Sequence, residues 1–295
     1  MKIKQNKYIK VDKPILVLGY DWERYQKHPN NEKSKKESLK GLKAIINAHR
    51  EYNKPLTIYV VGRMLELEET LTLFQEITRK YSNDFLDIQQ HTYAHTLIKD
   101  HAFKGKGLSL DELKVDITKA TNLIQKWSDK KVIGMHSAQS FYKGMQGEVK
   151  RLQILWECGI RFISSDGRGM GEKAPAPWKD ENGNFRQPYF YRNEGYPELL
   201  EIPNQGYSDN YYKGLSKYSD IEPMTPEEEL DAQTRNMEVS LKHNLVFVPV
   251  QHPWSIAKKD PNATVIKGML SFAIEKGIEV MSAKQLYDYV LSLCF

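Results

Sequence analysis

Short apolar runs alternate with longer amphipathic segments along almost the whole chain. Several of these runs are continuously apolar, which is typical of parallel strands that are buried on both faces. The pattern predicts eight strands, at residues 14–19, 56–61, 85–90, 131–136, 160–164, 198–202, 245–251 and 278–281.

The segments between these strands carry helix signals. Apolar residues at positions 39, 42, 45 and 46 form one stripe with helical spacing. Ser109-x-x-Glu112 is a capping box, and Thr225 to Glu228 combines a cap, a proline at the first helical position and an acidic third position. Gly159 and Gly277 follow apolar helical runs and are predicted to end those helices.

Strands that alternate with helices over this length predict an α/β fold of the barrel type. We expect one domain over residues 14–295, preceded by an N-terminal extension at 1–13. The segment 165–198 is rich in Gly, Pro and Tyr and has no clear period, so it is predicted to be a long loop or hairpin that walls a cleft.

Composition narrows the class of protein. The chain has 295 residues, 40% of them hydrophobic, and a formal net charge of +5, which is ordinary for a globular protein. Its lysines form no basic patch interleaved with aromatic residues, so nucleic-acid binding is not expected. The first twelve residues are polar and no run is long enough for a membrane span, so we expect no signal peptide, no transmembrane segment and a cytoplasmic location. The sequence gives no indication of the oligomeric state.

Candidate chemistry lies at the ends of predicted strands. His91 and His95, four residues apart after the strand at 85–90, can reach one metal ion from one side. Asp21 ends the first strand and offers a carboxylate as third ligand. His136 and His252 also fall at strand ends, and His252 is a candidate general acid. Active sites of α/β barrels lie at this end of the strands, so the coincidence predicts one site.

Several segments, in order, resemble the polysaccharide deacetylases of the NodB-homology type, carbohydrate esterase family 4. Gly19-Tyr20-Asp21 resembles the first family motif, and residues 54–62 resemble the second strand. His91 to His95 fits the His-Thr/Ser-x-x-x-His motif, and Val248 to Trp254 resembles the last catalytic motif. Residues 200–203 also look like a family strand. The resemblance covers about residues 14–290.

The resemblance implies a distorted (β/α) barrel with seven or eight strands. It implies one divalent metal ion held by Asp21, His91 and His95, with zinc expected and cobalt, nickel and iron accepting the same ligands. It also implies that His252 protonates the leaving amine and that Trp254 lies at the substrate.

The chain departs from the family pattern in its first motif, which usually has two adjacent aspartates, a base and then a ligand. Tyr20 precedes Asp21 here, so the usual base is missing. Glu23 is a substitute base, because alternate strand residues share a face. The alternative assignment makes Asp21 the base and Glu23 the ligand.

The third motif differs as well. The family has Arg-x-Pro where this chain has His136-Ser137-Ala138, so the arginine that orients the base is absent and His136 is expected to take a polar, substrate-binding role. Asp166, which follows the strand at 160–164, is expected either to tune His252 or to serve only as a turn residue.

These residues support a metal-dependent hydrolase of non-peptide carbon–nitrogen bonds, most simply one that deacetylates an N-acetylated sugar or polysaccharide. A small intracellular amide is a variant substrate. The alternative is a catalytically degenerate carbohydrate-binding protein on the same fold. Its sugar-stacking candidates are aromatic residues in and around the irregular segment: Trp178, Tyr189, Phe190, Tyr191 and Tyr207. A mononuclear iron oxygenase uses similar ligands, but its common fold does not alternate helix and strand.

Overall fold

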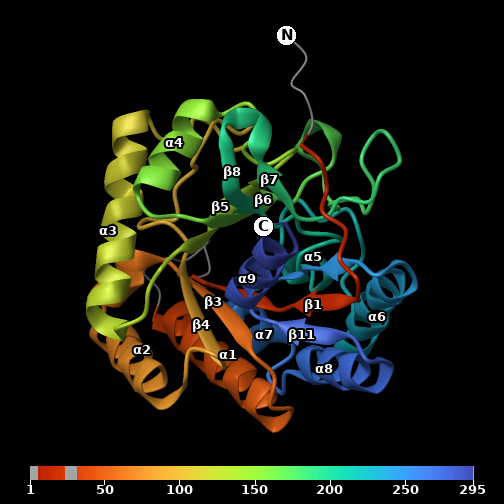
Figure 1. Cartoon of the computed structure of the whole chain (residues 1–295). Coiled ribbons are helices and arrows are strands. Elements are labelled where there is room, and N and C mark those ends of the chain that lie inside the picture. The colour runs from red at the N-terminus through yellow and green to blue at the C-terminus, as the bar shows by residue number, and fades with distance from the viewer. Residues whose placement is uncertain (1–5, 24–31, 295) are drawn as a thin grey trace.

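The computed structural model describes residues 6–23 and 32–294. A strongly curved sheet forms its centre and helices lie outside it (Figure 1). The strands are β1 (Ile15–Val17), β2 (Gly19–Trp22), β3 (Leu56–Val60), β4 (Leu86–Gln90), β5 (Gly134–Phe141), β6 (Phe162–Asp166), β7 (Tyr189–Tyr191), β8 (Tyr196–Glu201), β9 (Val246–Phe247), β10 (Val250–Gln251) and β11 (Glu279–Met281). The α-helices are α1 (Glu32–Glu51), α2 (Glu68–Lys80), α3 (Leu110–Ser128), α4 (Val149–Glu157), α5 (Asp209–Tyr212), α6 (Pro226–His243), α7 (Pro253–Lys259), α8 (Thr264–Lys276) and α9 (Ala283–Cys294). Short 3₁₀ turns are η1 (Gly62–Glu66), η2 (Met170–Glu172) and η3 (Arg192–Glu194).

Two hydrogen-bonded ladders form the wall of the sheet. One runs in the order β10-β2-β3-β4-β5-β6-β8-β7, and the other in the order β11-β1-β9. β1 continues into β2 through Leu18, and β9 continues into β10 through Val248 and Pro249, so the ladders join into one barrel-like wall. Among the described strands, every pairing is parallel except that of β7 with β8. The predicted α/β fold of the barrel type is confirmed.

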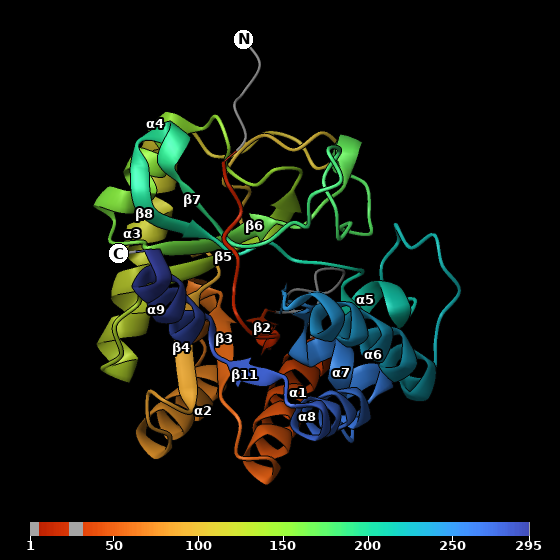
Figure 2. The ribbon, with the colours of Figure 1, turned by 45° about the vertical axis from the view of Figure 1, so that its right-hand side comes forward.

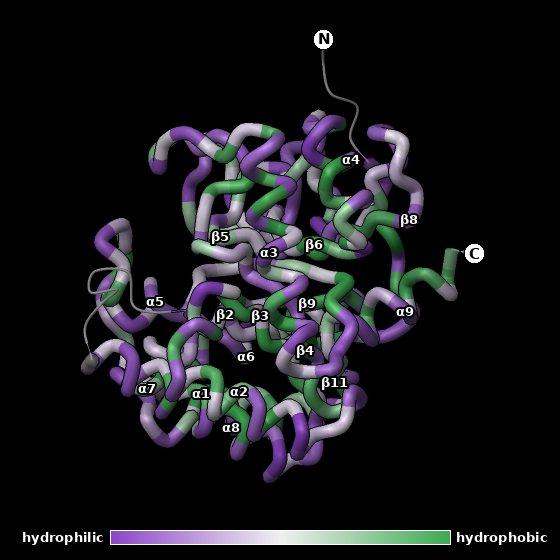
Figure 3. Tube along the Cα trace, turned by 90° about the vertical axis from the view of Figure 1, so that its left-hand side faces the viewer, coloured by the Kyte–Doolittle hydropathy of each residue, from purple (hydrophilic) through white to green (hydrophobic). Residues whose placement is uncertain are grey.

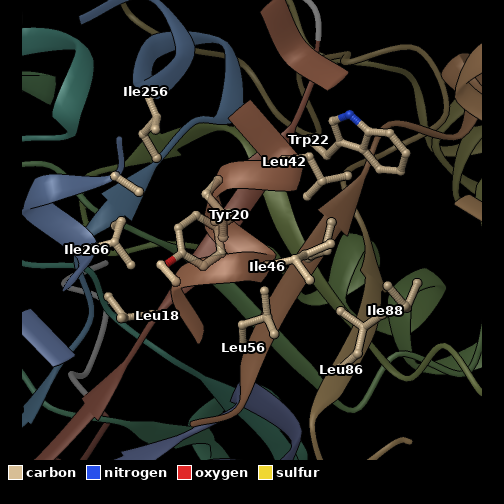
Figure 4. Packing of buried hydrophobic residues seen from close by; sticks show 14 of the residues in the cluster. Leu18, Tyr20, Trp22, Leu42, Ile46, Leu56, Leu86, Ile88, Ile256 and Ile266 are labelled. Carbon is tan, nitrogen blue, oxygen red and sulfur yellow. The ribbon is translucent and has the colours of Figure 1, made fainter. Parts of the chain in front are cut away.

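The first strand segment divides its side chains between two faces. Leu18, Tyr20 and Trp22 pack outward against helix residues, including Leu42 of α1 (Figure 4). The alternate positions of β1 belong to the inner cluster, which contains the buried residues Ile15, Val17, Tyr59, Phe162 and Val246. Asp21 continues this inner series, because successive strand residues point to opposite faces. Its carboxylate therefore faces the mouth of the barrel.

Glutamine side chains bridge places where the main-chain ladder is weak. Gln187 accepts from the main-chain N–H of Val246 at 2.7 Å and donates to its oxygen at 3.1 Å. Gln205 accepts from the N–H of Val248 at 3.0 Å, and Gln89 accepts from two main-chain N–H groups at the start of β5. A side-chain amide offers the same donor and acceptor as a peptide group, so it can replace ladder bonds. Gln187 and Gln205 thereby tie β9 to the opposite side of the wall.

All eight predicted strands are present, with their ends shifted by a few residues. The predicted capping box at Ser109 and the predicted cap at Thr225 are both confirmed. Gly277 adopts a φ of 72° at the end of α8, as a residue that ends a helix should. β7 was not predicted, because the irregular segment shows no period. Part of that segment has regular secondary structure, namely η2, β7 and η3. The segment also lines a cleft, as expected.

The distribution of polarity follows this architecture. Figure 3 shows apolar residues along the central strands and hydrophilic residues on many of the surrounding turns. Within residues 6–23 and 32–294, the helices are too short or too polar to span a membrane.

Candidate active site

Strands β2, β4 and β10 end at one cleft with a volume of about 190 Å³, which residues along β5 also line. Its lining includes Asp21 of β2, His91 after β4, His136 of β5 and His252 after β10. Figure 2 shows the irregular segment between β6 and β7 above α5 and the loop that follows α5, and residues from both also line the cleft. Parallel barrels place their active sites at this end of the strands.

The two motif histidines lie on a strained turn. Thr92 and His95 have φ values of 60° and 57°, a conformation that is rare outside glycine and an outlier for a β-branched residue. Such strain clusters at functional sites. His91 donates its Nδ1–H to the main-chain oxygen of His136 at 2.8 Å. This bond fixes the ring and leaves Nε2 directed at the carboxylates, in the manner of a metal ligand.

Asp21 and His136 form a buried pair. His136 Nδ1 lies 2.7 and 2.8 Å from the two Asp21 oxygens, and its Nε2 lies 3.3 Å from Asn204 Oδ1. Burial by itself would raise the pKa of Asp21, but the neighbouring His136 and His91 outweigh burial and lower it. Burial would lower the pKa of His136, but the Asp21 carboxylate raises it. Asp21 is therefore ionised at neutral pH, and its carboxylate favours the protonated form of His136.

Glu23 turns back toward the site just after β2. The main-chain N–H of Glu23 donates to the main-chain oxygen of Asp21 at 3.0 Å, and this bond closes a tight turn. Its carboxylate contacts His95 Nε2 and accepts from Trp254 Nε1 at 3.1 Å. Burial would raise the pKa of Glu23, but His95 and His91 lower it well below its usual range. Tyr20 faces the other way and bonds His49, so the residue before Asp21 takes no part in the site.

Among the described residues, two groups of three donors could hold a metal ion, and both include His91. One adds Asp21 and His136, and the other adds Glu23 and His95; within each group the ligand atoms lie within 4.8 Å of one another. In the first group both ring nitrogens of His136 already have partners, Asp21 and Asn204. In the second group His91 Nε2 lies 3.7 Å from Glu23 Oε2. Both groups supply two imidazoles and a carboxylate, a ligand set of catalytic zinc sites. The second group fits a metal ion better because the ring of His136 is already engaged on both sides.

The predicted ligands Asp21, His91 and His95 are divided between these two groups. Asp21, His91 and His95 do not form one of the donor groups found among the described residues. The turn after β2 brings Glu23 to His95, whereas His136 holds Asp21. The arrangement matches the alternative assignment, in which Glu23 is the ligand and Asp21 the base.

His252 lies across the cleft from these groups. Its Nδ1–H donates to Asp209 Oδ1 at 2.6 Å, and its main-chain N–H donates to Asp209 Oδ2 at 3.2 Å. Its Nε2 lies 3.8 Å from Asp21 Oδ2. Burial would lower the pKa of His252, but Asp209, Glu23 and Asp21 together raise it to about 9. His252 is therefore a cation at neutral pH, with its Nε2 proton directed toward the site.

Asp166 does not occupy the place predicted for it. Its carboxylate forms a buried ion pair with Arg186, and the partner of His252 is Asp209. The prediction that Asp166 tunes His252 is therefore wrong. The reason is topological: the Asp166 side chain packs under the irregular segment, whereas Asp209 opens α5 beside β10.

The five residues proposed to stack on a sugar, Tyr207 included, do not line the cleft. Tyr189, Phe190 and Tyr191 are buried in the core, and Trp178 stacks on Phe247. The aromatic residues that line the cleft are Tyr211, Tyr218 and Trp254. Trp254 thus lies at the cleft as expected, and His136 lines it while bonding Asp21.

Sequence reasoning missed Asp209 and its support. Lys213 lies 3.6 Å from Asp209 Oδ2 and 2.7 Å from Glu229, and all three are buried. Burial would raise the pKa of Asp209, but Lys213 and His252 lower it. The sequence signal was weak, since Asp209 begins a four-residue helix that has no apolar period, and Lys213 directly follows that helix.

The fold and the converging histidines and carboxylates define a barrel-type α/β protein with a candidate metal centre. No known family profile and no curated protein matches the sequence. Solved structures do match its fold. A candidate polysaccharide deacetylase from Mycobacterium smegmatis superposes with a TM-score of 0.72 at 13% identity, covering 100% of this chain and 96% of that one.

Two further structures share the fold. Puue allantoinase superposes with a TM-score of 0.65 at 12% identity, covering 93% of this chain and 89% of its own. A CE4-family pseudoenzyme from Bacillus anthracis superposes with a TM-score of 0.56 at 14% identity, covering 94% of this chain and 66% of its own. The resemblance to the polysaccharide deacetylases is therefore confirmed at the level of the fold.

Proposed function

We propose that this protein is a divergent polysaccharide-deacetylase-type enzyme that hydrolyses a non-peptide carbon–nitrogen bond with the help of a divalent metal ion. The substrate is an N-acetylated sugar or a small amide. One observation carries the proposal: an ionised carboxylate, Asp21, and a cationic imidazole, His252, face each other within 3.8 Å beside a two-histidine, one-carboxylate donor set.

Amide hydrolysis needs a base for the attacking water and an acid for the departing nitrogen. Asp21 accepts the proton of the water, and His136 orients Asp21 in place of the absent arginine. His252 donates its Nε2 proton to the leaving nitrogen, while Asp209 holds the ring by its Nδ1–H. Trp254 excludes solvent on one side and fixes Glu23. Pairs of groups whose pKa values are moved apart are typical of such acid–base assignments.

Glu23, His91 and His95 would hold the metal ion, with zinc the first to test. A divalent ion bound there would lower the pKa of a coordinated water and polarise the amide carbonyl. The small cleft suits one acylated unit, because pockets for larger ligands commonly span roughly 300–1,000 Å³.

The test compares metal content and turnover in four proteins: wild type, Glu23→Gln, Asp21→Asn and the double variant His91→Ala/His95→Ala. Elemental mass spectrometry should find a stoichiometric metal in wild type and Asp21→Asn, and little in the other two. Turnover of N-acetylated sugars and small amides should fall roughly 10²–10⁴-fold in Asp21→Asn, because a general base contributes about that much.

Two outcomes would contradict this assignment. Loss of metal in Asp21→Asn with retention in Glu23→Gln would return Asp21 to the ligand role. Ligand binding without turnover, unaffected by a chelator and by the histidine substitutions, would identify a degenerate carbohydrate-binding protein, as one structural neighbour named a pseudoenzyme illustrates.

A further inference from the structure

The mouth of the cleft carries three cations from three separate segments. Lys104 comes from the loop after β4, Arg168 from the segment after β6 and Lys217 from the loop after α5, and all three line the cleft. We call them the cationic rim. Segments this far apart in sequence meet only because the barrel gathers its C-terminal loops at one end.

Each cation of the rim lies against a tyrosine ring. Lys104 Nζ lies 3.9 Å from the centroid of the Tyr218 ring, and Lys217 Nζ lies 4.9 Å from the same centroid. Arg168 donates from Nη1 to the Tyr211 hydroxyl at 3.1 Å and lies 5.9 Å from that ring's centroid. Ring faces attract cations and restrict long side chains, so the rim is held at the cleft.

The cationic rim is not neutralised by direct ion pairs. In the part of the chain that the structure describes, the ion pairs within 4.0 Å involve none of Lys104, Arg168 and Lys217. The carboxylate of Glu172 is near enough to act on Arg168, but it accepts from the Tyr142 main-chain N–H and faces His101.

Arg168 carries a second signal. Its Nε–H is buried, and no acceptor for it is found among the described residues. Buried donors nearly always have a partner, and a charged one without a partner is unfavourable. An anion that enters the cleft would supply that acceptor, since guanidinium groups bind carboxylate and phosphate oxygens through paired donors.

From the cationic rim and the unpaired Arg168 donor we infer that the substrate carries an anionic group, a carboxylate or a phosphate, close to the bond that is hydrolysed. This inference rests on the proposed function and narrows its substrate class. The rim binds the anionic group while the acyl amide reaches the catalytic residues at the floor of the cleft.

Matched pairs of compounds test the inference. One pair is N-acetylglucosamine 6-phosphate and N-acetylglucosamine; the other is N-acetylglycine and its neutral methylamide. In each pair the anionic member should have the higher kcat/KM. Arg168→Gln should lower kcat/KM for the anionic member about 10- to 100-fold, the usual effect of a hydrogen bond to a charged group, and should lower it much less for the neutral member. Whichever pair responds identifies phosphate or carboxylate as the group.

A matched control is Lys126→Gln, which removes an exposed cation that lies over the Trp127 ring on α3, away from the cleft. This variant should keep the full anionic preference. Raising the ionic strength should reduce the preference in wild type, because salt screens exposed charges.

A binding arm separates failure of this inference from failure of the proposed function. Calorimetric titration of His91→Ala/His95→Ala with each pair should still show tighter binding of the anionic member, weakened by adding Arg168→Gln, even if no hydrolysis is ever found. Equal or weaker binding of the anionic member in both pairs, with or without turnover, would overturn the inference.

Discussion

The pair formed by His252 and Asp209 shows how single residues set the chemistry of the cleft. Both side chains are buried, with exposed fractions of 8% and 0%. The Asp209 carboxylate keeps the His252 ring charged although burial disfavours that charge, and Lys213 in turn keeps Asp209 ionised. A buried chain of alternating charges thus delivers one proton donor to the substrate.

Asp209→Asn should lower kcat/KM roughly 10²–10³-fold, within the range for loss of acid catalysis. His252 acts as an acid only while protonated, so the wild-type rate should fall as pH rises through about 9. Removing the Asp209 charge lowers the pKa of His252, so the fall should begin at a lower pH. The pH profile of kcat/KM reports this value.

Asp260→Asn is the control for losing a buried aspartate, since Asp260 is 2% exposed and bonds the start of α8. It should reduce stability and leave the alkaline limb of the pH profile in place. An alkaline limb that stays near pH 9 in Asp209→Asn would show that His252 is not the acid.

At the scale of elements, close contact between α1 and α7 positions His252. A Cβ atom built on Gly41 of α1 would lie 1.8 Å from the main-chain oxygen of Pro253, the first residue of α7. Only glycine allows this approach, because the contact is to backbone that cannot rotate away. His252 directly precedes α7, so the spacing of the two helices fixes where its ring lies.

Gly41→Ala should push α7 away from α1 and destabilise the protein by about 1–3 kcal/mol, the usual cost of overpacking. It should also lower kcat, because His252 and Trp254, which bonds Glu23, both move with α7. Thermal unfolding and steady-state kinetics measure the two effects. The control Gly268→Ala meets the flexible Leu230 side chain and should cost less and leave kcat unchanged; equal effects of both variants would contradict this account of α7.

At the scale of the whole molecule, the proposed metal centre joins distant parts of the chain. Glu23 follows β2, and His91 and His95 follow β4, so an ion held by all three would cross-link the two strands that flank β3 in the wall. A ligand that binds only the folded state stabilises it by an amount that grows with the logarithm of the free ligand concentration relative to Kd.

Removing the metal with a chelator should therefore lower the Tm. If the free metal concentration is about 1,000 times Kd before the chelator is added, its removal lowers the free energy of unfolding by about 4 kcal/mol. For a chain of this length, that loss corresponds to a fall in Tm of roughly 10 °C. Scanning calorimetry with and without chelator measures the change. The chelator should have no effect on His91→Ala/His95→Ala, and an equal shift in that variant would show that the stabilising ion binds elsewhere.

The pattern of apolar residues by itself determined the eight strands, because each is a run that must be buried between helices and the barrel interior. It also placed Asp21, His91 and His252 at one end of the barrel, because parallel strands end together. Only the tertiary structure decided which carboxylate meets the motif histidines, since a tight turn after β2 swings Glu23 toward His95.

The tertiary structure also decided the partner of His252 and the charge of the cleft mouth. Asp209 lies 43 residues from His252 in sequence, and the cationic rim is assembled from three loops. Contacts of this kind depend on which loops the barrel-like wall brings together, and loops carry no periodic signal from which the sequence could have predicted them.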